Sequence, residues 1–224
     1  MLADIRKAGA DRTICLGDVA TLGPSPTLTI ELLRAVGCPC IMGNHDEFLL
    51  NPELVHRYTE NPMIIEAVAW CRARLSDEDL EFIGGFETLR RIELGQGMSA
   101  LFYHGSPTSH METLLATTPA EEIDRLLSGH TATIMVGGHT HVQMVRQHRG
   151  NLLINPGSVG LPFKEFSDGQ EPTVLGHSEY ALVSADGNGV SITLRRVPFD
   201  LATHRGAIAK SDHPMRGWLL GQYS

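Results

Sequence analysis

Apolar residues along the chain form two kinds of pattern, one with the spacing of a helix and one made of short continuous runs. Leu28, Leu32 and Val36 recur at helical spacing and Gly37 follows them, so a helix is predicted over residues 26–36. Short apolar runs bounded by glycine or polar residues predict strands. These runs lie at 13–16, 38–42, 87–94, 99–103, 131–136, 152–154, 180–184 and 190–197.

Residues 47–83 are predicted to be mostly helical, because apolar positions recur on one face and Ser76-x-x-Asp79 resembles a capping box. A short helix is predicted over 121–127, and a weak helical pattern begins at Leu201. The sequence Asp186-Gly187-Asn188-Gly189 predicts a hairpin turn between the last two strands. We therefore expect one α/β domain over residues 1–224, with residues 47–83 as a helical, cap-like segment.

Charge, apolar runs and cysteine spacing argue against several classes of protein. The formal net charge is −8 and the basic residues are scattered, which argues against a protein that coats nucleic acid. No apolar run approaches the ~20 residues of a membrane span, and no secretory signal is visible, so a soluble cytoplasmic protein is expected. Cys38-Pro39-Cys40 lacks the spacing of Cys-x-x-Cys motifs, and the cysteines are interpreted as small buried thiols.

Polar residues beside glycine follow several of the predicted strands. They comprise one carboxylate, one amide and three imidazoles. Loops at the carboxyl ends of strands are where α/β sheets place their ligands. A mixed oxygen and nitrogen donor set suits manganese, iron, zinc or nickel better than magnesium or calcium. The candidate metal ligands are Asp18, Asn44, His104, His139 and His141.

The motifs Gly17-Asp18, Gly43-Asn44-His45-Asp46, His104-Gly105 and Gly138-His139-Thr140-His141 together resemble the signature of the calcineurin-like metallophosphoesterases. The resemblance is closest to small bacterial and archaeal phosphodiesterases, and it covers essentially the whole chain. It implies a fold of two mixed β-sheets packed as a sandwich and flanked by helices. It also implies a site with two metal ions at the ends of the strands.

The resemblance assigns a role to each matching residue. Asp18 would bridge the two ions, Asn44, His104 and His139 would complete one site, and His141 would belong to the other. His45 would protonate the leaving oxygen or stabilise charge on the phosphoryl group. The implied reaction is in-line attack of a metal-activated hydroxide on the phosphorus of a phosphodiester, with broad specificity.

Asn155-Pro156-Gly157-Ser158 follows a predicted strand and allows two interpretations. Its backbone N–H groups could bind the phosphate, which makes Asn155, Gly157 and Ser158 candidate substrate-binding residues. The segment could equally form a tight structural turn.

The resemblance also shows a departure from the family pattern. Relatives open with a strand that ends in Asp-x-His, and no such motif precedes Asp18. We therefore expect an N-terminally truncated fold, one well-formed metal site, and a second site that is incomplete or completed by His110, Asp46 or a neighbouring subunit. A homo-oligomer could cover the gap left by the strand. The alternative function is a catalytically impaired, metal-binding scaffold.

Overall fold

The computed structural model describes residues 1–167, 169–186 and 189–223 as two compact units. The sheet unit consists of residues 1–12 and 88–199, and the helical unit consists of residues 13–87 and 200–224. No helix within the described residues combines the length and the apolar character needed to cross a membrane. That the chain forms one domain stays a prediction.

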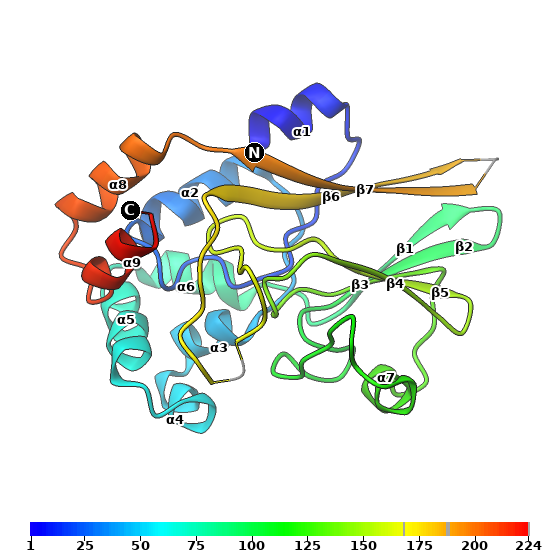
Figure 1. Ribbon diagram of the computed structural model, residues 1–224, viewed down its shortest axis with the longest axis horizontal. Helices are drawn as coiled ribbons and strands as arrows, with labels where there is room; N and C mark the ends of the chain where they lie inside the picture. The colour runs from blue at the N-terminus through cyan, green and yellow to red at the C-terminus, as the bar shows by residue number, and fades with distance from the viewer. Residues whose placement is uncertain (168, 187–188, 224) are drawn as a thin grey trace. The chain divides into compact units, whose positions relative to one another are not determined.

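The sheet unit holds a five-stranded sheet and a two-stranded sheet (Figure 1). In the first sheet, whose order is β1-β2-β3-β5-β4, the three central strands β2, β3 and β5 run parallel and the two outer pairs are antiparallel. Strand β1 of this sheet contacts β6 of the antiparallel β6–β7 pair. The predicted α/β fold with two sheets and flanking helices is confirmed. The strands are β1 (Arg90–Gly95), β2 (Met98–Phe102), β3 (Ile134–Val136), β4 (Met144–His148), β5 (Asn151–Asn155), β6 (His177–Asp186) and β7 (Gly189–Pro198).

Helix α7 (Ala120–Leu127) covers the five-stranded sheet because one face of it is apolar. Ile123 and Leu126 of this helix pack in one cluster with Leu101 of β2 and Leu153 of β5. Burying such side chains removes apolar surface from water, which is the main stabilising contribution of a core. This packing fixes the parallel strands whose ends carry the predicted histidines.

Helix α1 (Leu2–Ala8) is tied to the two-stranded sheet by a single carboxylate. Asp4 accepts a hydrogen bond of 2.6 Å from the Tyr180 hydroxyl and pairs with the Arg195 guanidinium at 3.0 Å. Both partners come from β6 and β7, and their hydrogen bonds hold the pKa of Asp4 below its ordinary value.

The helical unit confirms most of the predicted helices. Residues 26–36 form the predicted helix, which ends at Gly37, and Ser76 and Asp79 form the predicted capping box. The core of the helical unit includes Ile30, Leu49 and Cys71. The helices are α2 (Pro26–Val36), α3 (Asn44–Leu50), η1 (Pro52–Leu54), α4 (Val55–Tyr58), α5 (Pro62–Arg72), α6 (Asp77–Gly84), α8 (Leu201–Lys210) and α9 (Arg216–Gln222).

Two predicted strands are absent from the described structure, one observed strand was not predicted, and one predicted turn lies outside the described residues. The runs 13–16 and 38–42 form isolated bridges, Cys15 with Cys40 and Ile41 with Glu87, instead of strands. Pro39 interrupts the second run, and a proline has no N–H to extend a ladder. Strand β4 was missed because its middle residues are polar, and the predicted turn residues 187–188 lie outside the described residues.

His213 joins the C-terminal segment to α5 as a buried neutral side chain. Its Nδ1 accepts a hydrogen bond of 3.1 Å from the Met215 N–H, and its ring packs edge-on against Trp70 with centroids 4.7 Å apart. Burial and then the charge of Arg74 lower the pKa of His213 to about 4, while Asp212 acts in the opposite direction. The native state therefore disfavours the imidazolium form.

We expect the free energy of unfolding to fall as the pH is lowered from about 6.5 to about 4, because the unfolded chain then binds a proton that native His213 does not. This residue contributes at most about 3 kcal/mol, since its pKa falls from 6.5 to about 4 and each unit of pKa difference is worth ~1.4 kcal/mol. Urea unfolding at several pH values measures it. His213→Asn keeps an acceptor for the Met215 N–H but cannot titrate, so its loss over this range should be smaller. An identical pH dependence in both proteins would contradict the assignment.

Candidate metal centre

The backbone at Asp18 is held in an unusual conformation by a buried carboxylate of the same unit. Asp18 has a φ of 56° and follows Gly17, whose φ is 93°. Asp46 is fully buried and accepts hydrogen bonds from the N–H groups of Asp18 at 2.7 Å, Val19 at 2.9 Å and Gly43 at 2.9 Å. Asp46 therefore positions Asp18, and its oxygens are engaged with backbone N–H groups rather than open as a replacement ligand.

The pKa of Asp46 reflects this environment. Burial and then the neighbouring charge of Asp18 raise it to about 7, while the three backbone N–H donors act in the opposite direction. The stabilisation of the loop by hydrogen bonds is therefore partly offset by the cost of placing two carboxylates side by side.

Asn44 and His45 begin helix α3 directly beside Asp18. The His45 N–H donates a hydrogen bond of 2.9 Å to Asp18 Oδ1. Gly43 lies so close that a Cβ on it would be 2.1 Å from Asp18 Oδ1. Glycine is therefore required at this position by the approach of the carboxylate. The helical unit places Asp18 beside Asn44 and His45, and their roles in the site stay predictions.

Tyr58 is a neighbour of His45 that the sequence did not reveal. The His45 ring packs edge-on against Phe48 at 5.2 Å and against Tyr58 at 5.9 Å between centroids. Burial and then the charge of Asp18 raise the pKa of the Tyr58 phenol. No sequence pattern marks Tyr58, because its position depends on how α4 folds back beside α3.

The sheet unit supplies the predicted histidines at the ends of parallel strands. His104 follows β2, and His139 follows β3, which pairs in parallel with β2. Their rings lie 5.3 Å apart between centroids, at an interplanar angle of 72°. The Gly138 N–H donates a hydrogen bond of 2.7 Å to the His104 carbonyl, which locks the two loops together. The ends of β2 and β3 therefore place these two imidazoles side by side, and their role as metal ligands stays a prediction.

The loop that carries His139 and His141 is strained and is held from β5. Both residues have left-handed backbone, with φ values of 64° and 58°. Such conformations cost about 1–3 kcal/mol each for residues other than glycine and persist only where the surroundings enforce them. Buried Asn155 enforces them here, because its Nδ2 donates to the Gly138 carbonyl at 2.6 Å and to Thr140 Oγ1 at 2.9 Å.

The tautomer of His141 follows from a single hydrogen bond. Its Nδ1 lies 2.8 Å from the Leu161 carbonyl, which can only accept, so Nδ1 carries the proton. Nε2 is then the nitrogen with a lone pair for a metal ion, and a carbonyl partner for the other ring nitrogen is the usual arrangement of metal-binding histidines. His141 therefore fits the role of a metal ligand.

The structure places Asn155, Gly157 and Ser158 in a turn with internal hydrogen bonds. The Gly157 N–H donates 2.9 Å to Asn155 Oδ1, and Ser158 Oγ accepts 3.1 Å from the Leu161 N–H. Gly157 has a φ of 82°, and a Cβ there would lie 2.0 Å from Glu179 Oε2. These contacts favour the structural interpretation of the segment, and its role in binding substrate stays a prediction.

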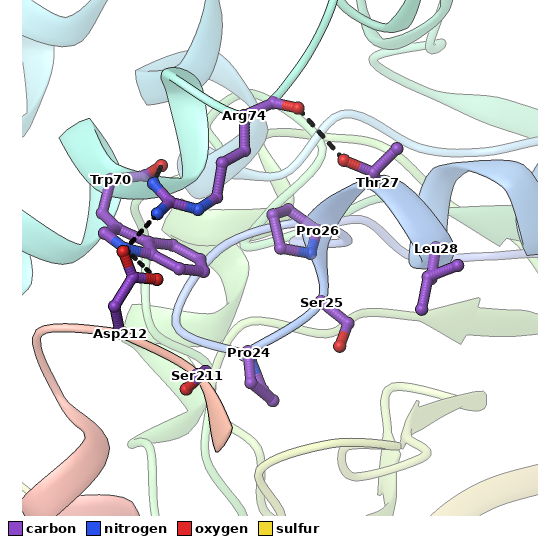
Figure 2. A pocket seen from close by; sticks show the side chains of 9 residues that line it. All are labelled: Pro24, Ser25, Pro26, Thr27, Leu28, Trp70, Arg74, Ser211 and Asp212. Carbon is purple, nitrogen blue, oxygen red and sulfur yellow. Dashed lines mark hydrogen bonds and ion pairs between the residues drawn. The ribbon is translucent and has the colours of Figure 1, made fainter. Parts of the chain in front are cut away.

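A surface pocket of about 360 Å³ in the helical unit is lined by residues other than the predicted site residues (Figure 2). Figure 2 shows Arg74 beside Trp70 and paired with Asp212, and the Arg74 to Asp212 distance is 2.7 Å. The charges of Arg74 and Asp212 compensate each other, and none of the predicted ligands lines the pocket. The pocket therefore gives no support for a site of charged chemistry.

Comparisons with known proteins find relatives of similar sequence and fold. The chain is 27% identical over 229 residues to the uncharacterized protein MJ0912 of Methanocaldococcus jannaschii, covering 96% of this chain and 87% of that protein. A metallophosphoesterase from Sphaerobacter thermophilus shares the fold with a TM-score of 0.65 and 21% identity, over 100% of this chain and 91% of the other. The hypothetical protein PH1004 from Pyrococcus horikoshii shares the fold with a TM-score of 0.76 and 14% identity. The match covers 98% of this chain and 88% of PH1004.

The family follows from a match that spans most of the chain. Residues 1–180 match the calcineurin-like phosphoesterase superfamily domain. The matched range contains Asp18, Asn44, His104, His139 and His141. The chain therefore belongs to the calcineurin-like phosphoesterase superfamily.

Proposed function

We propose that the protein is a metal-dependent phosphodiesterase of broad specificity. Its superfamily is one of metal-dependent phosphoesterases. The observation that carries the proposal is the left-handed backbone of Asp18, His139 and His141, three residues that are not glycine and that match metal-ligand positions of the family. Backbone strain of this kind concentrates at functional sites, because the surrounding structure must be built to hold it.

The proposed ligands are the five residues that match the metal-ligand motifs of the family. Asp18, Asn44, His104 and His139 would hold one ion, and Asp18 and His141 would contribute to a second, less complete site. Carboxylate, amide oxygen and imidazole together fit manganese, iron, zinc or nickel. Two features are expected of ligands whose orientation is fixed in advance: Asp46 positions the backbone of Asp18, and the hydrogen bond to the Leu161 carbonyl fixes the tautomer of His141.

Divalent ions in such a site supply Lewis acidity for the in-line attack of water on phosphorus. The protein's own contribution to the reaction is a proton donor for the leaving oxygen, which we assign to His45. Its backbone N–H is fixed on Asp18, and its ring is confined by Phe48 and Tyr58. These contacts limit the motion of the imidazole, so that little conformational entropy is lost when it meets the substrate.

The proposal is tested by measuring the metal content of the purified protein and its hydrolysis of bis(p-nitrophenyl) phosphate, before and after manganese is added. Hydrolysis of this diester that depends on the metal supports the phosphodiesterase. Turnover of p-nitrophenyl phosphate but not of the diester would mean a monoesterase. Bound metal without hydrolysis of either compound would mean a metal-binding scaffold.

Replacing His45 by glutamine is expected to lower kcat by about 10²–10⁴-fold, the usual contribution of a general acid. The metal content should remain unchanged, because no metal-ligand role is assigned to this ring. Elemental analysis and steady-state kinetics on the diester check both parts. His56→Gln, an exposed histidine of α4, is the matched control and should keep wild-type kinetics. Loss of metal from the His45 variant would show that the ring is a ligand.

A further inference from the structure

Cysteines that are far apart in the sequence meet in the helical unit. Cys15 and Cys40 are paired residues of an isolated parallel bridge. The Cys15 N–H donates 3.0 Å to the Pro39 carbonyl, and the Ile41 N–H donates 2.8 Å to the Cys15 carbonyl. Paired residues of adjacent extended segments direct their side chains to the same face, with the segments ~4.8 Å apart. The two thiols are therefore neighbours.

Cys38 completes this group of three thiols. Pro39 restricts Cys38 to extended backbone, so that Cys38 and Cys40 can share a face. The Cys40 thiol donates a hydrogen bond of 3.5 Å to the Cys38 carbonyl, and the pKa of Cys40 responds to the side chains of both Cys15 and Cys38. Cys40 is buried, whereas Cys15 and Cys38 are partly exposed. The buried sulfur is thus flanked by two that solvent can reach.

Cys38 and Cys40 differ in acidity. The hydrogen bond from Cys40 lowers the pKa of Cys38 to about 7, whereas the contacts with Cys15 and Cys38, together with burial, raise that of Cys40. A substantial fraction of Cys38 is then thiolate at neutral pH, and the thiolate is the form that attacks disulfides. Cys71 provides a contrast, because it is buried apart from this group and burial raises its pKa to about 12.

We propose that Cys15, Cys38 and Cys40 form a thiol–disulfide exchange site in which a low-molecular-weight disulfide links Cys15 to Cys40. The Cys38 thiolate attacks the oxidant, forms a mixed disulfide and releases one thiolate. Cys40 then attacks the Cys38 sulfur and releases the second half of the oxidant as a thiol. Cys15 attacks the Cys40 sulfur and regenerates the Cys38 thiolate. In sum, two protein thiols become a disulfide and one oxidant disulfide becomes two thiols.

Geometry favours the link between Cys15 and Cys40 as the end product. Residues paired across a bridge have Cα atoms ~5 Å apart, inside the usual disulfide range. Residues i and i+2 of an extended chain are ~6.6 Å apart, near the upper limit of that range, and strained disulfides are more easily reduced. The disulfide would join the segment that ends in Asp18 to the segment that ends in Asn44.

The test uses the folded protein after reduction and removal of the reductant. Oxidised glutathione is added at neutral pH, free thiols are counted over time, and the product is mapped by mass spectrometry without reduction. We expect a peptide pair linked through Cys15 and Cys40, with Cys38 and Cys71 still free, and full reversal by dithiothreitol. The proposal is overturned if all the thiols stay reduced, if Cys71 is in the linkage, or if glutathione on Cys38 is the final product.

Two variants separate the roles of the thiols. Cys38→Ser should give the same Cys15–Cys40 product on the order of tenfold more slowly, because the thiol with the lowered pKa is then absent. Cys71→Ser is the matched control and should change neither the rate nor the product. An unchanged rate in Cys38→Ser would contradict the assignment of Cys38 as the attacking thiol. The mapping of the wild-type protein decides the main proposal even if a variant fails to fold.

Discussion

Replacing His139 by alanine is expected to abolish both tight metal binding and hydrolysis of the diester. His139 lies beside His104 at the ends of adjacent parallel strands. Its left-handed backbone sets the direction of its imidazole. Changes to groups that only orient a ligand already cost 10–100-fold in metal affinity or activity, so loss of a ligand should cost more than about 100-fold. Elemental analysis and kinetics with added manganese measure the two losses.

His130→Ala is the matched control for this experiment. His130 belongs to the same unit and is partly buried, but it is not among the predicted ligands, and its backbone N–H bonds to the Leu127 carbonyl whatever the side chain. This variant should keep its metal and its activity. Full activity in His139→Ala would remove His139 from the metal centre. Equal losses in both variants would point to a general loss of folding.

Replacing Asn155 by leucine is expected to lower the free energy of unfolding by about 3 kcal/mol and to weaken metal binding. The side chain is buried and bonds to the Gly138 carbonyl, Thr140 Oγ1 and the Gly157 N–H. Leucine fills a similar volume but leaves these groups without their partner, and each buried unsatisfied group costs about 1–3 kcal/mol. The loop with His139 and His141 then loses what holds its strained backbone.

Urea unfolding and metal titration of Asn155→Leu measure these effects. Asn151→Leu, at the partly buried start of the same strand, is the control and should change stability far less. The experiment also separates two roles for Asn155. If the variant has unchanged stability and metal affinity but a raised KM for the diester, then the amide contacts substrate, as the sequence pattern suggested, and does not hold the loop.

Much of the fold and of the candidate site could be predicted from local patterns. The helix at 26–36 is encoded by apolar spacing and a closing glycine, and the Ser76–Asp79 capping box by two residues three apart. The histidines after β2 and β3 are recognisable because glycine and polar residues directly follow a buried run. Such signals work because the period of the side chains and the backbone preference of glycine act over only a few residues.

Contacts between distant segments were decided by the tertiary structure. The sequence pattern made Asp46 a candidate metal ligand. In the structure its carboxylate accepts hydrogen bonds from the backbone N–H groups of Asp18 and Val19. Asn155 supports a loop that is 15 residues away along the chain, at Thr140. Cys15 and Cys40 become neighbours because the runs 13–16 and 38–42 meet in an isolated bridge, a pairing that the pattern of each run alone does not reveal. The sequence by itself determined which residues stand at the ends of strands and which family they resemble. Which side chains meet depends on strand register and loop paths, and these are set by the packing of the whole chain rather than by neighbouring residues.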